Sequence, residues 1–260
     1  MSTTEISNLS LKDLVISQDN TIDIRDCYVK TGIETILEQL DQELVGLESV
    51  KTRVREISSV LLFDRIREIQ ELPTLNSSLH MSFTGRPGTG KTSVAAKLGL
   101  VLRQLGYLTK GHITNVTRED LVGQYVGHTA PKTKEQLNKA RGGILFMDEA
   151  QHLYKPDNER DYGAEAIELL LQVMENQRED LIFVFSGPKT KIEGFFNSNP
   201  GISSRIGQHV DFADYNVEEL TAITKFLIHN DNRYKYDEDV VKILVHYIEQ
   251  FIDFPAFSNV

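Results

Sequence analysis

Eight consecutive residues restrict the fold of this chain more than any other feature of its sequence. They are Gly85-Arg86-Pro87-Gly88-Thr89-Gly90-Lys91-Thr92, a full match to the pattern G-x-x-x-x-G-K-[ST]. The pattern has a physical meaning only between a strand and a helix, where backbone N–H groups and the positive helix end can face an anion. A strand pattern over 79–84 precedes the motif and a helical pattern over 93–105 follows it. The sequence therefore predicts a phosphate-binding loop (P-loop).

The P-loop predicts binding of ATP together with Mg²⁺. Lys91 is expected to reach the β- and γ-phosphates, and the Thr92 hydroxyl is expected to ligate the metal ion. The glycines allow the backbone to curl where side chains would intrude on the phosphates. The other predicted nucleotide-binding residues of this segment are Gly85, Pro87, Gly88, Thr89, Gly90 and Ser93. A chance match in an ordinary turn is the alternative, and the flanking strand and helix patterns disfavour it.

A second signal is an apolar run that ends in two acids, Ile144-Leu145-Phe146-Met147-Asp148-Glu149. A strand buried on both faces delivers such acids to the ligand-binding edge of a parallel sheet. Asp148 is predicted to hold Mg²⁺ through its water shell, and Glu149 to orient and deprotonate the attacking water. Taken alone, Asp148 is as easily a helix N-cap. Its pairing with a P-loop favours the metal role, and the two adjacent acids favour hydrolysis over binding alone.

The rest of the chain alternates between helical and strand patterns. Strands are predicted at 79–84, 112–116, 144–147, 181–185 and 210–212. Helices are predicted at 33–44, 50–69, 93–105, 164–175, 217–230 and 237–251. Strands that alternate with helices imply an α/β fold with a parallel sheet and right-handed crossovers. The strand patterns stop after Tyr215, so a domain boundary is predicted near residue 214, and residues 1–30 lack periodicity apart from one short helical pattern at 9–15.

Composition and charge disfavour several classes of partner. The chain of 260 residues has a formal net charge of -10, which argues against a nucleic-acid binder. No run approaches the roughly 18 apolar residues of a membrane span, so no membrane partner is predicted. The acids Glu5, Asp13, Asp19 and Asp23 argue against a secretory or transit leader. Cys27 is the single cysteine, which indicates a reducing compartment and a small buried apolar side chain.

Further segments resemble the CbbX family of AAA+ ATPases, the red-type rubisco activases, over nearly everything from Ile33 to Val260. Besides the two nucleotide motifs, the likeness is carried by Glu43–Leu47, Arg118–Ala130, Asp157–Gly163 and Ser198–Gly201. The sequence patterns and the resemblance together predict three parts. These are a flexible N-terminal arm over 1–32, an AAA+ ATP-binding α/β domain with its N-terminal helices over 33–214, and a partial helical lid domain over 215–260.

The resemblance also implies roles for residues that the pattern alone leaves open. Val45 and Gly46 align with the segment that contacts the adenine. Tyr125 aligns with the aromatic residue of a central pore loop, which grips a threaded peptide; without the family, it is read as a loop aromatic packed under a helix. Arg205 aligns with the arginine finger that reaches the γ-phosphate held by the next subunit, whereas a lone Arg is otherwise read as a surface charge.

By resemblance, the chain is expected to work with copies of itself as a homo- or hetero-hexameric ring. Such a ring uses ATP to pull on the C-terminal tail of the red-type rubisco large subunit and releases a tightly bound sugar phosphate. Ribulose 1,5-bisphosphate is implied as an effector, and the chloroplast stroma or a bacterial cytoplasm as the location. Two alternatives stay open: an AAA+ ATPase with a different client, and a weakly hydrolysing regulatory subunit of a mixed ring.

Three departures from the family pattern motivate the regulatory alternative. Ser186-Gly187-Pro188-Lys189 stands where the family tends to have Ala-Gly-Tyr, so no sensor residue transfers to this chain. Gln151 and His152 stand where the family favours aromatic residues. By resemblance, an Arg-bearing sensor and a last helix lie just beyond Val260, so the lid domain is expected to be truncated.

Overall fold

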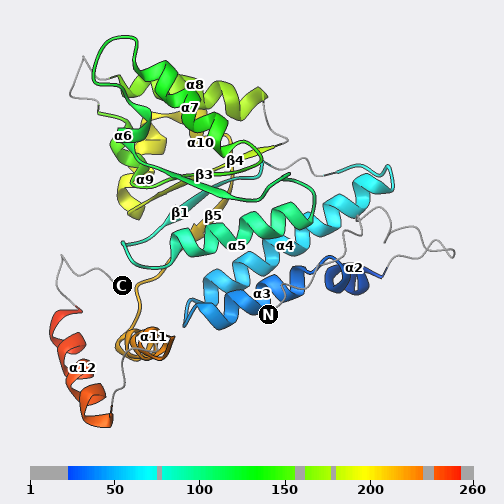
Figure 1. Ribbon diagram of the computed structural model, residues 1–260. Coiled ribbons are helices and arrows are strands. Elements are labelled where there is room, and N and C mark those ends of the chain that lie inside the picture. Colours follow the sequence, from blue (N-terminus) through cyan, green and yellow to red (C-terminus); the bar gives the residue numbers. More distant parts are fainter. Residues whose placement is uncertain (1–22, 75–77, 156–161, 177–179, 231–236, 253–260) are drawn as a thin grey trace.

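A parallel sheet forms the centre of the molecule. The structure is a computed structural model that describes residues 23–74, 78–155, 162–176, 180–230 and 237–252 (Figure 1). The predicted short helix at 9–15 lies outside these residues. The sheet has five strands in the order β2-β3-β4-β1-β5, and all its neighbouring strands run parallel. The strands are β1 (His80–Thr84), β2 (Ile113–Val116), β3 (Gly143–Met147), β4 (Leu181–Gly187) and β5 (Ile206–Asp211).

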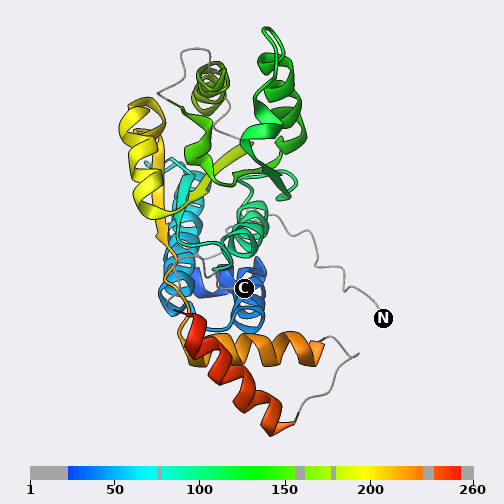
Figure 2. The ribbon, with the colours of Figure 1, turned by 90° about the vertical axis from the view of Figure 1, so that its left-hand side faces the viewer.

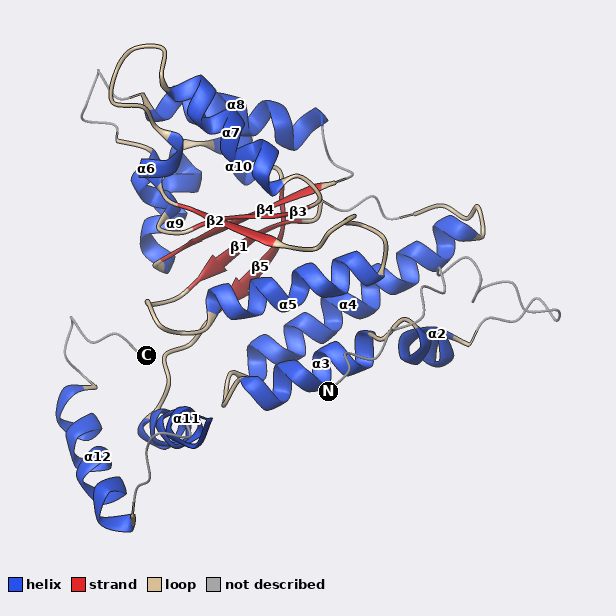
Figure 3. Cartoon of the chain, in the orientation of Figure 1, coloured by secondary structure: helices blue, strands red, loops and turns tan. Residues whose placement is uncertain are grey.

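Helices cover both faces of the sheet (Figure 3). One layer contains α3 (Ile33–Glu43), α4 (Glu48–Ile69) and α5 (Lys91–Gln104), preceded in the chain by α2 (Ile24–Lys30). The other contains α6 (Arg118–Leu121), α7 (Thr129–Ala140), the short 3₁₀ turn η1 (Ala150–Leu153), α8 (Gly163–Asn176), α9 (Lys189–Ser198) and α10 (Pro200–Ser203). The last two described helices are α11 (Val217–Asn230) and α12 (Glu238–Phe251). The predicted α/β class is confirmed.

The alternation of side chains along β3 explains why its sequence is apolar throughout. Ile144 and Phe146 pack into a core shared with α3, α4 and α5. Leu145 and Met147 point to the opposite face and pack with α7 and α8. A strand with helices on both faces buries every side chain, so it shows a continuous apolar run instead of an alternating one. This burial fixes β3, and with it the two acids that follow.

The edge strand β5 is longer than its sequence pattern predicts. The pattern indicates residues 210–212, whereas the strand starts at Ile206 and pairs with β1 from His80 to Thr84. Residues 206–209 of the strand are Ile, Gly, Gln and His, and none of them is fully buried. Gln208 accepts a hydrogen bond from Arg53 of α4 at 2.9 Å. A polar side chain that is hydrogen-bonded in this way gives no apolar pattern from which a strand can be predicted.

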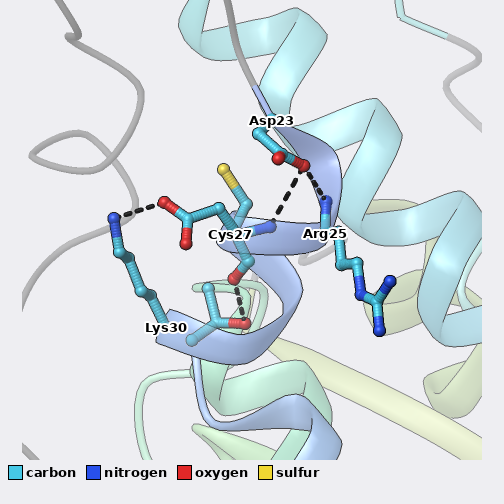
Figure 4. Close-up of polar contacts among 6 residues, drawn as sticks. Asp23, Arg25, Cys27 and Lys30 are labelled. Carbon is cyan, nitrogen blue, oxygen red and sulfur yellow. Dashed lines mark hydrogen bonds and ion pairs between the residues drawn. The ribbon is translucent and has the colours of Figure 1, made fainter.

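Within the predicted N-terminal arm, residues 24–30 form helix α2. The Asp23 side chain caps this helix by accepting hydrogen bonds from the backbone N–H groups of Arg25 (2.8 Å) and Asp26 (3.3 Å) (Figure 4). Cys27 is buried against the core, as predicted, and this burial raises the pKa of its thiol. Cys27 is the buried residue of this seven-residue helix, so α2 shows no repeating apolar spacing that would predict it.

The C-terminal helices α11 and α12 lie at the end of the molecule farthest from the α7–α8 layer (Figure 2). Leu220 of α11 and Ile248 of α12 nevertheless join the same core as α3, α4 and α5. Glu219, in the first turn of α11, lies against Gly46 in the loop that joins α3 to α4. In the described part of the chain, no helix is both long enough and apolar enough to cross a membrane.

Candidate functional site

The P-loop follows β1 and leads directly into α5. Gly88 and Gly90 have φ angles of 77° and 86°, in the left-handed region that glycine tolerates and other residues disfavour. Gly85 is held against the backbone of the β5 end, where an added Cβ would lie 2.6 Å from Phe212 O. The Thr89 hydroxyl donates to Arg86 O at 2.8 Å inside the loop. These contacts give the curled backbone that the sequence motif predicts.

The Lys91 ammonium folds back into the P-loop. Its Nζ donates to Gly85 O at 3.0 Å and to Arg86 O at 2.6 Å. Burial lowers the pKa of Lys91, although the carboxylates of Asp148 and Glu149 act in the opposite direction. A buried ammonium that is held by carbonyl oxygens and lies near the first turn of a helix is well placed to meet an anion.

The two acids lie where β3 ends, at the same edge of the sheet as the P-loop. The Asp148 backbone N–H continues the sheet by donating to Val116 O at 2.9 Å. The Ser186 hydroxyl, at the end of neighbouring β4, donates to Asp148 Oδ1 at 3.3 Å. Glu149 has a left-handed backbone, with φ 49°, and its carboxylate accepts a hydrogen bond from the Gln151 amide. The strand order β3-β4-β1 therefore places Ser186 between the two acids and the P-loop.

A cavity of about 400 Å³ joins these groups. Most of the residues singled out from the sequence line it, namely Val45, Pro87, Gly88, Gly90, Lys91, Thr92, Ser93, Asp148 and Glu149. The size suits a small-molecule ligand of nucleotide dimensions. One end offers backbone N–H groups and an ammonium for phosphates, and carboxylate and hydroxyl oxygens for Mg²⁺. The donor set therefore fits a nucleoside triphosphate with its magnesium ion.

The other end of the cavity is apolar, and the sequence does not predict it. Its wall contains Leu44 from the α3–α4 loop and four residues of the C-terminal segment, Tyr215, Ile223, Phe226 and Leu227. Burial raises the pKa of the Tyr215 phenol to about 12. The spacing of Ile223, Phe226 and Leu227 marks one face of a helix. The spacing predicts an apolar helix face, but it does not predict that this face covers a ligand site.

Gly46 sits behind the cavity wall, next to α11. Its φ angle is 65°, and a Cβ added there would lie 2.2 Å from Glu219 Oε1. Glu219 belongs to a reciprocal cap at the start of α11, where it accepts from the Asn216 backbone N–H at 2.9 Å and its own N–H donates to Asn216 Oδ1 at 2.8 Å. Gly46 is therefore the point where the α3–α4 loop contacts α11, the helix that carries Phe226 and Leu227.

Arg205 does not line the cavity of its own chain. It follows α10, and its guanidinium donates to Gly201 O at 2.7 Å and pairs with Glu175 of α8 at 3.3 Å. Its side chain is 27% exposed, whereas that of Glu175 is 61% exposed. The structure therefore separates Arg205 from the other predicted site residues.

Tyr125 lies on the loop between α6 and α7, and it does not line the cavity. It is 67% exposed, and its neighbour Val126 is 80% exposed. The Tyr125 ring makes an edge contact with His128, with ring centroids 5.6 Å apart. The reading of Tyr125 as an aromatic packed under a helix is therefore wrong. The loop presents two large apolar side chains to solvent.

The fold and the cavity together define a P-loop ATPase of the AAA class. Residues 81–207 match the family described as "ATPase family associated with various cellular activities (AAA)". This range runs from β1 to the start of β5, and it contains the P-loop, both acids, Tyr125 and Arg205.

The chain belongs to the CbbX family, as its similarity to three relatives shows. It is 54% identical to "Protein CfxQ homolog" of Galdieria sulphuraria, over 98% of this chain and 83% of that protein. It is 52% identical to "Ribulose bisphosphate carboxylase/oxygenase activase, chloroplastic" of Cyanidioschyzon merolae, over 94% and 83%. It is 50% identical to "Protein CbxX, chromosomal" of Cupriavidus necator, over 91% and 74%. The family resemblance stated from the sequence is confirmed.

Proposed function

We propose that this chain hydrolyses ATP, with Mg²⁺, to drive the remodelling of a protein. The observation that carries the proposal is the convergence of Lys91, Thr92, Asp148 and Glu149 on one cavity with an apolar far wall. Lys91 and the P-loop backbone would hold the phosphates, and Thr92 and Asp148 would hold the metal ion. Bound Mg²⁺ would neutralise charge on the phosphates. Glu149 would orient the water and accept its proton, and Val45 and Gly46 would lie beside the adenine.

The same proposal includes a ring of subunits, a hexamer by family resemblance. Arg205 lies outside its own cavity, on the α10 end of the molecule, so it would serve the nucleotide of a neighbouring copy. A guanidinium supplied in trans stabilises charge in the transition state and makes hydrolysis depend on assembly. To reach out, Arg205 would exchange its ion pair with Glu175 for the γ-phosphate. Because Glu175 is exposed and solvated ion pairs are weak, breaking this ion pair would cost little free energy.

We further propose that the client is the red-type rubisco large subunit, from which an inhibitory sugar phosphate is released by pulling. The relative of Cyanidioschyzon merolae, 52% identical to this chain, carries the name of a rubisco activase. The exposed pair Tyr125 and Val126 supports a threading role, because a solvent-facing aromatic residue on a loop can grip an extended peptide. The proposed effector is ribulose 1,5-bisphosphate, and the proposed location is the stroma or a bacterial cytoplasm.

The proposed division of labour follows the chain. Residues 1–32 would act as an arm, residues 33–214 would bind and hydrolyse ATP, and residues 215–260 would form the lid. The apolar wall from α11 supports the last assignment, because the lid would move with the nucleotide it covers. A different client, or a weakly hydrolysing partner in a mixed ring, is the competing proposal. Pro188, Gln151 and His152 are the departures that favour the mixed ring.

The deciding experiment is ATP turnover by the purified protein, alone and with sugar-phosphate-inhibited red-type rubisco. We expect hydrolysis, rubisco reactivation, and loss of both in Lys91→Ala and Arg205→Ala. Tyr125→Ala is expected to keep hydrolysis and lose reactivation. Turnover without reactivation would move the proposal to another client. Nucleotide binding without turnover would favour the regulatory subunit, and reactivation by Tyr125→Ala would exclude threading through that loop.

A further inference from the structure

We propose that Gln151 is a positioning residue for Glu149, and this inference rests on the proposed ATP hydrolysis. Gln151 stands two residues after Glu149, in the short turn η1. Its Nε2 donates a hydrogen bond to Glu149 Oε2. Gln151 is not among the residues that line the cavity, whereas Glu149 is. Gln151 would therefore act on the reaction through the carboxylate and without touching the nucleotide.

The backbone of Glu149 supports a constrained carboxylate. Its φ and ψ are 49° and 47°, and it is one of three described non-glycine residues with a positive φ. Such a conformation persists only where the surroundings hold it, and it is common at functional sites. Backbone and side chain of Glu149 are thus both fixed, the first by the turn and the second by Gln151.

The chemistry of the amide determines which way it points. Turning the Gln151 amide over would bring its carbonyl oxygen against the Glu149 carboxylate, and two acceptors cannot share a hydrogen bond. With the NH₂ group on Glu149, Gln151 Oε1 is buried and has no hydrogen-bond partner among the described residues. It lies against Gly187, where an added Cβ would be only 2.3 Å away. Gly187 leaves the space that lets Gln151 reach Glu149.

The turn that carries Gln151 is itself anchored from a second element. The Arg118 guanidinium, at the start of α6, donates to His152 O at 3.0 Å and to Leu153 O at 2.9 Å. Ala150 and Leu153 are buried in the core under α8. Gln151 is therefore held on a rigid support. A donor on such a support sets the orientation of the carboxylate more accurately than a solvated side chain could.

The consequence is a division of labour between the two carboxylate oxygens. Gln151 occupies Oε2, and the other oxygen of Glu149 is then the acceptor for the proton of the attacking water. Without the amide, the carboxylate can rotate and spend only part of its time in the productive orientation. A lost orientation lowers the rate of the chemical step and leaves the binding of the ground state nearly unchanged.

The test compares Gln151→Met, which keeps the length and removes the amide, with Gln151→Glu, which adds a like charge beside Glu149. His152→Ala is the matched control, since it changes an exposed side chain of the same turn and keeps the carbonyl that Arg118 binds. We measure ATP turnover, thermal unfolding, and the affinities for ADP and for ADP with aluminium fluoride, a mimic of the transferring phosphoryl group.

We expect Gln151→Met to lower kcat roughly tenfold, with KM within about twofold, as for the loss of an outer-shell partner. Affinity for ADP with aluminium fluoride should fall by a similar factor while affinity for ADP alone stays unchanged, and Gln151→Glu should lose more. His152→Ala should match the wild type. Full activity in Gln151→Met, or an equal loss of both affinities with a lower Tm, would overturn the inference. A wild type without turnover would instead overturn the proposed function and this inference with it.

Discussion

The Ser186 hydroxyl lies 3.3 Å from Asp148 Oδ1, across the boundary between β4 and β3. Ser186 is fully buried, whereas Asp148 is exposed. The sequence assigns no role to Ser186, because the segment 186–189 departs from the family pattern. The structure gives this serine a defined contact with the acid proposed to hold Mg²⁺. Its contribution is open to direct measurement.

Ser186→Ala is expected to weaken the use of Mg²⁺. The substitution removes a hydrogen bond that orients Asp148, and the loss of an outer-shell contact typically costs about tenfold in metal affinity or activity. We expect the Mg²⁺ concentration for half-maximal ATP turnover to rise by roughly that factor. Ser82→Ala is the control, because Ser82 is buried on β1 and its hydroxyl has no partner among the described residues. Equal shifts in the two variants would contradict a specific role for Ser186.

Lys91→Met is expected to have opposite effects on nucleotide binding and on stability. Hydrogen bonds to charged groups contribute about 1.5–3 kcal/mol, so the affinity for ATP should fall about 100-fold. The nucleotide-free variant should nevertheless unfold at a higher temperature at neutral pH. Burial lowers the pKa of Lys91 below its ordinary value of 10.5, which means that the folded state disfavours the charged form.

The sign of the Lys91 effect can be followed with pH. Because the folded-state pKa is the lower one, the cost is fully present below that pKa and disappears as the pH rises past 10.5. The stability difference between Lys91→Met and the wild type should therefore shrink in alkaline solution. Chemical unfolding at several pH values measures it, with Lys139→Met on exposed α7 as the control for a lost surface charge. A variant less stable than the wild type at pH 7 would contradict the prediction.

Gly46→Ala is expected to weaken ATP binding through the lid. The new Cβ would lie 2.2 Å from Glu219 Oε1, so the capped start of α11 must shift. That shift moves Phe226 and Leu227 in the cavity wall. We expect about tenfold weaker binding of a fluorescent ATP analogue, corresponding to about 1.4 kcal/mol. Strain from the positive φ adds a loss of roughly 1 kcal/mol of stability.

Gly127→Ala separates these two contributions of Gly46→Ala. Gly127 also has a positive φ, 80°, but no atom lies within 4 Å of an added Cβ. The control should lose stability to a similar extent and keep its affinity for the nucleotide. If both variants kept the affinity, the contact between Gly46 and Glu219 would have no bearing on the site.

Tyr215→Phe is expected to make the protein less sensitive to alkaline pH. Burial raises the pKa of the Tyr215 phenol from 10.0 to about 12, so the unfolded chain ionises first. The free energy of unfolding should therefore fall by about 1.4 kcal/mol per pH unit from this one group between those pH values. Chemical unfolding of the wild type and of Tyr215→Phe at about pH 9, 10 and 11 tests this prediction, because the ionisation of the unfolded chain begins in that range.

The control for Tyr215→Phe is Tyr247→Phe on α12. Tyr247 is 60% exposed, and its removal should leave the alkaline fall in stability as in the wild type. An identical pH dependence in all three proteins would contradict the assignment to Tyr215.

Much of the fold was predictable because its elements follow local rules. The apolar runs of β3 and β4 indicate strands buried on both faces, and the periodicity of α3, α4 and α5 indicates their helices. The sequence does not predict helix α7, because Thr129 and Thr133 fill two of its buried positions. The Thr129 hydroxyl accepts a hydrogen bond from the Gly123 N–H, and the Thr133 hydroxyl donates one to Leu121 O. Hydrogen bonding makes these polar side chains compatible with burial, and no periodic apolar pattern remains.

By itself, the sequence determined the phosphate end of the site. Glycines with the required φ angles, Lys91, Thr92 and the two acids are encoded in two short segments whose conformation follows from local chemistry. Tertiary structure alone decided the rest. It set Ser186 against Asp148, brought Gly46 against Glu219, closed the cavity with Phe226 and Leu227, and separated Arg205 and Tyr125 from their own site. These relations join residues far apart in the chain, and packing, which depends on the whole fold, creates them.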